Sequence, residues 1–315
     1  MTLILLTGAG FSRNWGGWLA NEAFEYILGR REIGEELRTR LWEDKVVKRQ
    51  GFEDTLGGLQ QQKQRGDRSA AEMVRQFMSA LVAMFDEMNQ GLSRATFEEQ
   101  IDVSMMVRPF LTSFDYIFTL NQDLLLEHHY LNNRSPSAKF AGFHRPGLKP
   151  VAAAKDAKWT PDHTKLRIEP GQQPYLKLHG SSDWVRDSKE PLLVLGGGKS
   201  VEIAQDPLLT WYQKEFSAAL HRHGAKLMVI GYSFSDQHIN EIIGRAADQG
   251  GLTLFIVDPE GVDVLDKWRG FGIRPRQELQ DQLNPYIRGA SRRPLSATFG
   301  HDRVEHGKLM AFLNG

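Results

Sequence analysis

The chain of 315 residues contains no cysteine. This absence excludes disulfide bonds, a cysteine nucleophile and every zinc site built on cysteine ligands. An excess of charge of either sign is also missing, because 39 Lys and Arg residues balance 39 Asp and Glu residues. The charge balance therefore does not favour nucleic acid or a membrane surface as the main partner.

Long apolar runs are missing as well. No stretch approaches the roughly 18 apolar residues of a membrane span, and no signal-type segment opens the sequence. We therefore expect a soluble, cytoplasmic protein without a membrane partner and without a targeting sequence before residue 1. A chain of this length can form one large domain or two unequal ones.

The first residues have the outline of a buried strand, a glycine turn and a helix. The apolar residues 3–6 stop at Thr7, and the turn that follows reads Gly8, Ala9, Gly10, Phe11 and Ser12. Glycine has no Cβ, so such a turn can bring backbone N–H groups against a phosphate. Arg13 stands where the third glycine of the dinucleotide-binding fingerprint belongs, so an ordinary strand-to-helix turn remains an alternative to a nucleotide site.

Further short apolar segments alternate with helix-like segments along the chain. The patterns predict strands over residues 114–120, 175–178, 191–195, 226–230 and 252–257, and helices over 14–28, 124–131, 207–223 and 237–247. Alternation of this kind is typical of an α/β fold with a doubly wound, Rossmann-like parallel sheet.

Two stretches interrupt this alternation. Residues 30–100 lack proline and are rich in Glu, Arg, Gln, Leu and Met, which predicts a helical insertion that forms a smaller domain or lid. Within it, residues 60–67 read as an exposed connection, and the Met and Phe stripe of residues 72–88 reads as core. Residues 132–174 are predicted to be a loop-rich insertion or cover, and 291–315 a C-terminal tail. The Rossmann-like domain is thereby assigned to residues 1–29 and 101–290.

The unusual polar residues follow the predicted strands. In a doubly wound sheet the ligand lies beyond the carboxyl ends of the strands, so one crevice should gather them. They are Gly8, Gly10, Ser12, Asn121, Asp123, His179, Gly231, Ser233 and Asp258. Helix capping is an alternative role for Asn121 or Asp123. His179 could exchange a proton near neutral pH or be a structural loop histidine. A metal site built on His, Asp or Glu remains an alternative, but no close-spaced ligand cluster stands out in the sequence, so no metal residues are predicted.

A second glycine run partly matches the sequence pattern of the phosphate-binding loop of ATPases. Gly196, Gly197 and Gly198 precede Lys199 and Ser200, but the first glycine that such a loop requires would fall at Leu193. The run is therefore predicted to be a flexible turn.

The motifs taken together resemble the sirtuin family. They occur in that family's order: residues 8–12, then Thr-Leu-Asn-Gln-Asp at 119–123, Lys-Leu-His-Gly at 177–180 and Gly-Tyr-Ser-Phe-Ser-Asp at 231–236. The resemblance covers about half of the chain and is closer to the bacterial sirtuin-like NADases of antiphage defence than to protein deacylases. Deacylases usually carry a four-cysteine zinc module, and their first motif continues into Ile-Pro-Asp-Phe-Arg, whereas residues 13–18 here read Arg-Asn-Trp-Gly-Gly-Trp.

The resemblance implies that NAD is a substrate and lies across the strand ends, with its pyrophosphate on residues 8–12. Cleavage of the bond between nicotinamide and ribose leaves an oxocarbenium-like centre, as in glycoside hydrolysis. Asn121 is then expected to hold the ribose and the attacking water in line. His179 is expected to bind a ribose hydroxyl and to accept its proton.

The remaining positions are expected to bind other parts of NAD. Asp123 would support the loop or the nicotinamide pocket, and Asp258 would bind the adenosine ribose. Gly231 and Ser233 would face the phosphate or adenosine side. No zinc is expected.

The function implied is an NAD hydrolase that depletes NAD in antiphage defence, an abortive-infection effector gated by self-assembly or by a partner. A homo-oligomer, a HerA-type ATPase or another component of a defence system, such as a short Argonaute, are the expected partners. A protein deacylase or ADP-ribosyltransferase would use the same cleavage. The non-enzymatic alternative is a module that senses NAD or ADP-ribose.

Overall fold

The computed structural model describes residues 1–98, 105–132, 139–151, 158–266 and 275–315. A parallel sheet of seven strands runs through it in the order β11-β10-β9-β1-β2-β6-β3. The strands are β1 (Thr2–Thr7), β2 (Tyr116–Thr119), β3 (Gly142–His144), β6 (Gln172–Lys177), β9 (Ala225–Ile230), β10 (Thr253–Val257) and β11 (Ile287–Ser291). Because β2 lies on one side of β1 and β9 on the other, the sheet is doubly wound with its switch point at β1. The predicted fold class is confirmed.

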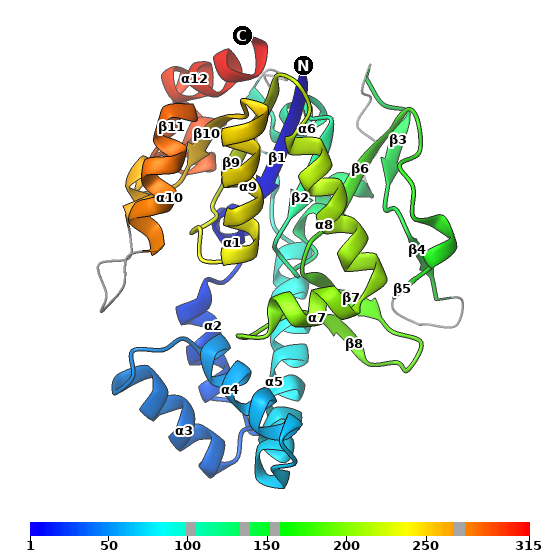
Figure 1. Cartoon of the computed structure of the whole chain (residues 1–315), viewed down its shortest axis with the longest axis vertical. Coiled ribbons are helices and arrows are strands. Elements are labelled where there is room, and N and C mark those ends of the chain that lie inside the picture. Colours follow the sequence, from blue (N-terminus) through cyan, green and yellow to red (C-terminus); the bar gives the residue numbers. More distant parts are fainter. Residues whose placement is uncertain (99–104, 133–138, 152–157, 267–274) are drawn as a thin grey trace.

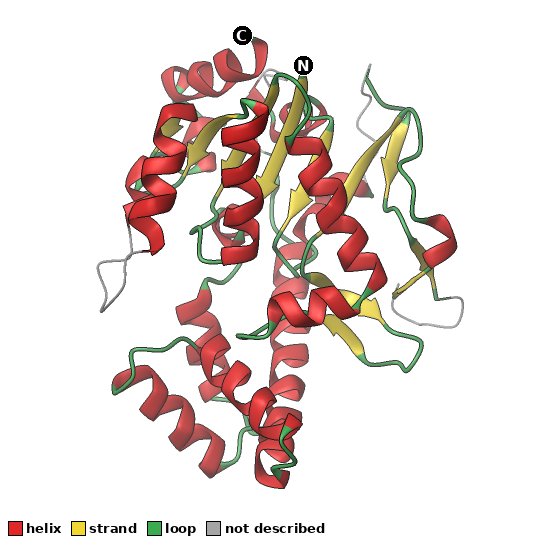
Figure 2. Ribbon diagram, in the orientation of Figure 1, coloured by secondary structure: helices red, strands yellow, loops and turns green. Residues whose placement is uncertain are grey.

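The central strand is apolar because helices cover both of its faces (Figures 1 and 2). Ile4, Leu5 and Leu6 are fully buried, and they alternate between the two cores. Ile4 and Leu6 pack with α8 (Pro207–Leu220) and α9 (Gln237–Gly250). Leu5 faces the core that also holds α1 (Ala9–Arg13), α6 (Val107–Thr112) and α12 (Arg303–Asn314).

A helical layer lies beyond the carboxyl end of β1, in the lower part of Figure 1. It consists of α2 (Ala20–Leu28), α3 (Glu35–Val46), α4 (Phe52–Gln64) and α5 (Arg68–Ser93). Its buried residues, such as Leu41, Leu56 and Phe77, belong to the same continuous core as Leu5 of the sheet. The helices expected in residues 30–100 are present, and their treatment as a separate domain or lid remains a prediction.

Two details of the sequence prediction are wrong in this region. Residues 14–28 form no single helix, because α1 ends at Arg13 and a turn with Gly16 at a φ of +93° precedes α2. The connection expected over residues 60–67 is shorter, because α4 continues through Gln64. Asp67 then caps α5 by accepting a hydrogen bond from the backbone N–H of Ala70 (3.0 Å).

The segment expected to be loop-rich, residues 132–174, holds β3, the start of β6 and two strands of a second sheet, β4 and β5, and its residues 133–138 and 152–157 lie outside the described residues. The second sheet consists of four strands in the order β4-β5-β7-β8. These are β4 (Leu148–Pro150), β5 (Trp159–Pro161), β7 (Gly180–Val185) and β8 (Pro191–Leu193). The other elements are a π-helix (Glu127–Leu131), α7 (Lys199–Gln205), α10 (Pro275–Leu283), α11 (Leu295–Thr298) and short 3₁₀ turns (His163–Lys165, Gly261–Asp266 and Asn284–Tyr286). The flexible turn expected at residues 196–200 is therefore confined to 196–198, and the tail expected at 291–315 forms two helices. None of the helices in the described ranges is long and apolar enough to cross a membrane.

A buried carboxylate fixes α3 within the helical layer and predicts an acid sensitivity. Asp44 is buried and accepts hydrogen bonds from Arg40 (3.1 Å) and Lys48 (2.5 Å). Burial by itself would raise the pKa of this carboxyl, but the bonds from both cations and from Thr55 hold the pKa below its ordinary value of 3.8. A lowered pKa in the folded state stabilises the fold above the unfolded pKa, and this contribution is lost as the pH falls through the folded value.

We expect Asp44→Asn to lower the free energy of unfolding by about 1–2 kcal/mol at pH 7, because two hydrogen bonds to charged groups are weakened. The gap to the parent protein should shrink as the pH falls below 3.8, because the carboxyl of Asp44 takes up a proton first in the unfolded chain and, at still lower pH, in the folded protein. Urea denaturation at pH 7, 5 and 3 measures it, with the exposed Asp86→Asn as the matched control. A gap of equal size at all three pH values would show that the charge of Asp44 is not its origin.

Candidate active site

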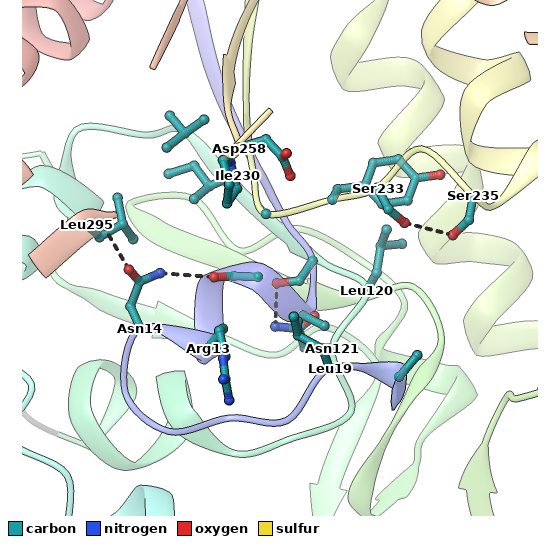
Figure 3. Close-up of a pocket in the computed structure, with 18 of the residues that line it drawn as sticks. Arg13, Asn14, Leu19, Leu120, Asn121, Ile230, Ser233, Ser235, Asp258 and Leu295 are labelled. Atoms are coloured by element: carbon teal, nitrogen blue, oxygen red, sulfur yellow. Dashed lines mark hydrogen bonds between the residues drawn. The ribbon is translucent and has the colours of Figure 1, made fainter. Parts of the chain in front are cut away.

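A cavity of about 850 Å³ lies beyond the carboxyl ends of the central strands (Figure 3). This strand-end cavity is lined by the residues that follow β1, β2, β6, β9 and β10, together with Arg293, Pro294, Leu295 and Ser296 after β11. Its volume falls within the roughly 300–1,000 Å³ that is usual for ligand pockets. The switch point of the sheet is thus hollow at the place where α/β proteins bind ligands.

The glycines of the first turn permit a close contact between two strand ends. The N–H of Gly8 donates to the carbonyl of Ile230 (3.0 Å), and the N–H of Gly10 donates to the carbonyl of Gly231 (2.9 Å). A Cβ on Gly8 would lie 2.5 Å from the carbonyl oxygen of Gly231. These N–H groups therefore join the turn after β1 to the turn after β9, a role that the phosphate-loop interpretation of residues 8–12 did not include.

Asn121 follows β2 and lies in the wall of the strand-end cavity (Figure 3). Its side-chain nitrogen, Nδ2, donates to the carbonyl of Gly8 (2.9 Å) and to Oγ of Ser12 (3.0 Å). Its backbone N–H donates to Oγ1 of Thr119 (3.1 Å). These bonds hold the amide in one orientation beside the first turn, so Asn121 is prepared to position a ligand group rather than to exchange a proton.

His179 follows β6 and is nearly fully buried, with 2% of its surface exposed. Its Nε2 lies 3.0 Å from Nε2 of His238, which belongs to the first turn of α9. Burial lowers the pKa of His179 to about 3, and the nearby Asp236 only partly opposes this effect. The imidazole is therefore neutral at pH 7 and can accept a hydrogen bond from a ribose hydroxyl.

A lysine links this histidine pair to the helical layer. Nζ of Lys199 lies 2.8 Å from Oδ1 of Asp236 and 2.7 Å from Oε2 of Glu53 in α4. Burial opposes the charge of Lys199, but the two carboxylates raise its pKa above the ordinary value. Gly57 of α4 lets the turn before Lys199 pack closely against this helix, because a Cβ on Gly57 would lie 2.4 Å from the N of Gly197.

A smaller cavity of about 120 Å³ adjoins the first and shares Ala9, Leu19, Ala20, Glu53, Asn121 and Gln122 with it. This apolar side cavity is lined by Trp18, Ala23, Phe52, Leu81, Met84, Phe85, Met88 and Leu195, with Asp123 at one side. Burial raises the pKa of Asp123, although Lys177 and the N–H of Leu125 oppose the rise. Its size suits a single aromatic ring rather than a nucleotide.

Most of the site residues predicted from sequence share one cavity. Gly8, Ala9, Gly10, Asn121, His179, Gly231, Ser233 and Asp258 line the strand-end cavity. Three do not line it. Phe11 is buried against Trp15 (5.2 Å between ring centroids), Ser12 is buried and accepts the bond from Asn121, and Asp123 lines only the apolar side cavity.

Sequence reasoning missed several residues of the strand-end cavity. Arg13, Asn14, Glu53, Lys199, Tyr232, Asp236 and Arg293 also line it. Asn14 accepts a hydrogen bond from the N–H of Leu295 (2.9 Å) and donates one to the carbonyl of Gly10 (2.9 Å), which ties the C-terminal segment to the first turn. Asp236 is the last residue of the motif at 231–236, but no role was predicted for it. His238 lies two residues beyond that motif.

The fold defines an α/β protein of the Rossmann-like class, with a cavity at the strand ends, where such folds bind ligands. A family model described as the SIR2-like domain matches residues 115–275, just over half of the chain. The chain therefore belongs to the SIR2-like domain family. The matched segment contains Asn121, His179 and the residues after β9, and the family fits an NAD-utilising enzyme. No curated protein matches the chain.

Proposed function

We propose that this protein hydrolyses NAD⁺ to ADP-ribose and nicotinamide. The observation that carries the proposal is the meeting of the two cavities at Asn121. The strand-end cavity has the volume for the ADP-ribose part of NAD, and the apolar side cavity has the size of the nicotinamide ring. The bond between them would then lie beside Asn121, with His179 in the wall of the larger cavity.

In this arrangement the bond between the ribose carbon C1′ and the nicotinamide nitrogen breaks, and its electron pair leaves with the ring. The positive charge develops on the ribose as an oxocarbenium-like centre. Water adds to C1′ and loses one proton, so the products are ADP-ribose, nicotinamide and a proton. Asn121 contributes by holding the ribose and the water in line. His179, neutral at pH 7, accepts a hydrogen bond from a ribose hydroxyl as charge develops.

The other parts of the strand-end cavity suit the rest of NAD. Asp258 follows β10, and its Oδ1 accepts a hydrogen bond from the N–H of Glu260 (2.9 Å), which orients the carboxylate at the adenosine-ribose position. Arg13 and Arg293 offer cations to the pyrophosphate. Gly231 and Ser233 also line the cavity and would face the phosphate or adenosine side.

Unrestrained NAD hydrolysis would be toxic to the cell. An NAD hydrolase that acts as an effector of antiphage defence therefore needs its activity to be controlled. Lys199 offers a route for such control, because its ion pairs with Glu53 and Asp236 connect the helical layer to the carboxylate beside His179. We propose that self-assembly or a partner, such as a HerA-type ATPase, acts through this layer. This regulation is tested by comparing the rate of NAD loss with and without the added partner.

The proposed reaction is tested by incubating the purified full chain with NAD⁺ and separating the products by chromatography. We expect nicotinamide and ADP-ribose in equal amounts, without any acylated peptide. Turnover that depends on an acetylated peptide would instead identify a deacylase. Saturable NAD binding without nicotinamide release, alone and with partner, would favour the sensing module and overturn the hydrolase.

A further inference from the structure

His179, Asp236 and His238 converge although they are distant in the sequence. One ligand atom from each of the three side chains lies within 4.8 Å of the others. His179 and His238 are 59 positions apart, and their Nε2 atoms are 3.0 Å from each other. Asp236 precedes α9 directly, and His238 is the second residue of that helix. Two imidazoles and one carboxylate thus face a common centre.

The spacing suits a transition-metal ion. An ion at about 2.0–2.1 Å from each of its nitrogen ligands holds those nitrogens about 3.3 Å apart in tetrahedral geometry. The observed 3.0 Å between the histidines is close to this value, and the carboxylate oxygen, which lies within 4.8 Å of both nitrogens, would have to move closer by up to about 1.5 Å to complete the set. Two nitrogens and one oxygen leave a fourth position open, as in zinc sites with three protein ligands.

The donor set also selects the kind of ion. Imidazole nitrogens suit Zn²⁺, Cu²⁺, Ni²⁺ and Fe²⁺, whereas Mg²⁺ and Ca²⁺ prefer oxygen ligands. The backbone supports both histidines firmly, since His179 follows β6, which pairs with a strand on each side, and His238 lies on a helix of 14 residues. We propose that His179, Asp236 and His238 form a binding site for a first-row transition-metal ion such as Zn²⁺.

Lys199 sets the strength of this site. Its Nζ forms an ion pair with Oδ1 of Asp236 (2.8 Å), which leaves Oδ2 of the same carboxylate for an ion. The ammonium group opposes a cation at this distance, so the ion binds reversibly and more weakly than at an isolated three-ligand site. Removal of this charge by Lys199→Met is therefore expected to tighten metal binding.

Occupation of the site would inhibit the enzyme, an effect that rests on the proposed function. An ion on Nε2 of His179 replaces the hydrogen bond between Nε2 and His238 and fixes the imidazole proton on Nδ1, so the ring no longer has a nitrogen that can accept a hydrogen bond from the ribose hydroxyl. His179 lies in the wall of the strand-end cavity, so an ion beside it also places a positive charge close to the developing oxocarbenium centre. The metal thus opposes NAD cleavage both by blocking a group and by electrostatic repulsion.

Metal binding is measured first, without NAD. The full chain, freed of metal with a chelator, is titrated with Co²⁺ by visible absorption and with Zn²⁺ by calorimetry. We expect one equivalent to bind. His238→Ala, which removes one ligand, should weaken binding by more than the roughly 10–100-fold loss caused by outer-shell changes. The exposed His301→Ala is the matched control and should bind like the parent. Absence of a one-equivalent transition, or equal binding by His238→Ala, overturns the site.

Inhibition is measured second, with each variant compared with its own metal-free rate. Zn²⁺ should suppress nicotinamide release by the parent over the concentration range in which it binds, and a chelator should restore the rate. His238→Ala should need a concentration of Zn²⁺ at least 10-fold higher. Binding without inhibition would overturn the inhibitory role and leave the metal site standing. A parent chain that binds Zn²⁺ but never cleaves NAD contradicts the proposed function instead.

Discussion

Replacement of Asn121 by alanine is expected to lower kcat/KM for nicotinamide release on the order of 10²–10³-fold, because the ribose and the attacking water lose the group that aligns them. The amide is already held in place before the ligand arrives, by bonds from Nδ2 to the Gly8 carbonyl (2.9 Å) and to Oγ of Ser12 (3.0 Å). Alanine cannot replace this preorganisation. The loss should appear mainly in kcat, because the geometry matters most in the transition state.

The same substitution should change the fold little. Asn121 is only partly buried, and the two hydrogen bonds that alanine removes are worth about 1 kcal/mol each. Asn314→Ala, at an exposed position in α12, is the matched control for both rate and stability. Circular dichroism and NAD binding accompany the kinetics. Full activity in Asn121→Ala would mean that this residue only shapes the turn after β2, and the proposed catalytic site would be wrong even if the activity were real.

The central strands and the site at their ends were predictable because both follow from burial. A parallel strand covered on two faces must be apolar, so β1, β9 and β10 stand out as runs of Leu, Ile, Val and Met. Polar residues that end such runs must meet at one edge of the sheet. This logic found Asn121, His179 and Asp258, which line one cavity.

Edge strands and tertiary partners were not predictable in this way. β11 reads Ile-Arg-Gly-Ala-Ser and is partly exposed, so its composition carries no apolar run. β3 has three residues, all partly exposed. His238 was missed for another reason: its place beside His179 depends on how α9 packs against the end of β6, and nothing within the local sequence encodes that contact. Lys199 was not predicted as a site residue, because residues 196–200 were interpreted as a flexible turn. The lysine nevertheless forms an ion pair with Asp236.

Gly231→Ala should be the most destabilising single substitution discussed for this site. Gly231 has a φ of +64°, a left-handed conformation that costs alanine about 1–2 kcal/mol. Its Cβ would also lie 2.3 Å from the N of Phe11 and 2.4 Å from the carbonyl carbon of Gly10. Both atoms belong to the backbone and cannot rotate away, so overpacking adds about 1–3 kcal/mol. We expect a total loss of about 2–5 kcal/mol, a large share of the roughly 5–15 kcal/mol that stabilises a typical protein.

Gly224→Ala separates the two causes, because Gly224 has nearly the same φ, +65°, and no atom within 4 Å of its added Cβ. Gly224→Ala should lower the free energy of unfolding only by the conformational contribution, about 1–2 kcal/mol. Denaturant unfolding of both variants measures the difference, and equal losses would show that the contact between the turns after β1 and β9 is not tight. A real difference has a functional consequence, because the same contact sets the position of Gly8 and, through its carbonyl, that of Asn121. NAD turnover should therefore fall in Gly231→Ala even at temperatures at which the variant is folded, whereas Gly224→Ala should keep the parent rate.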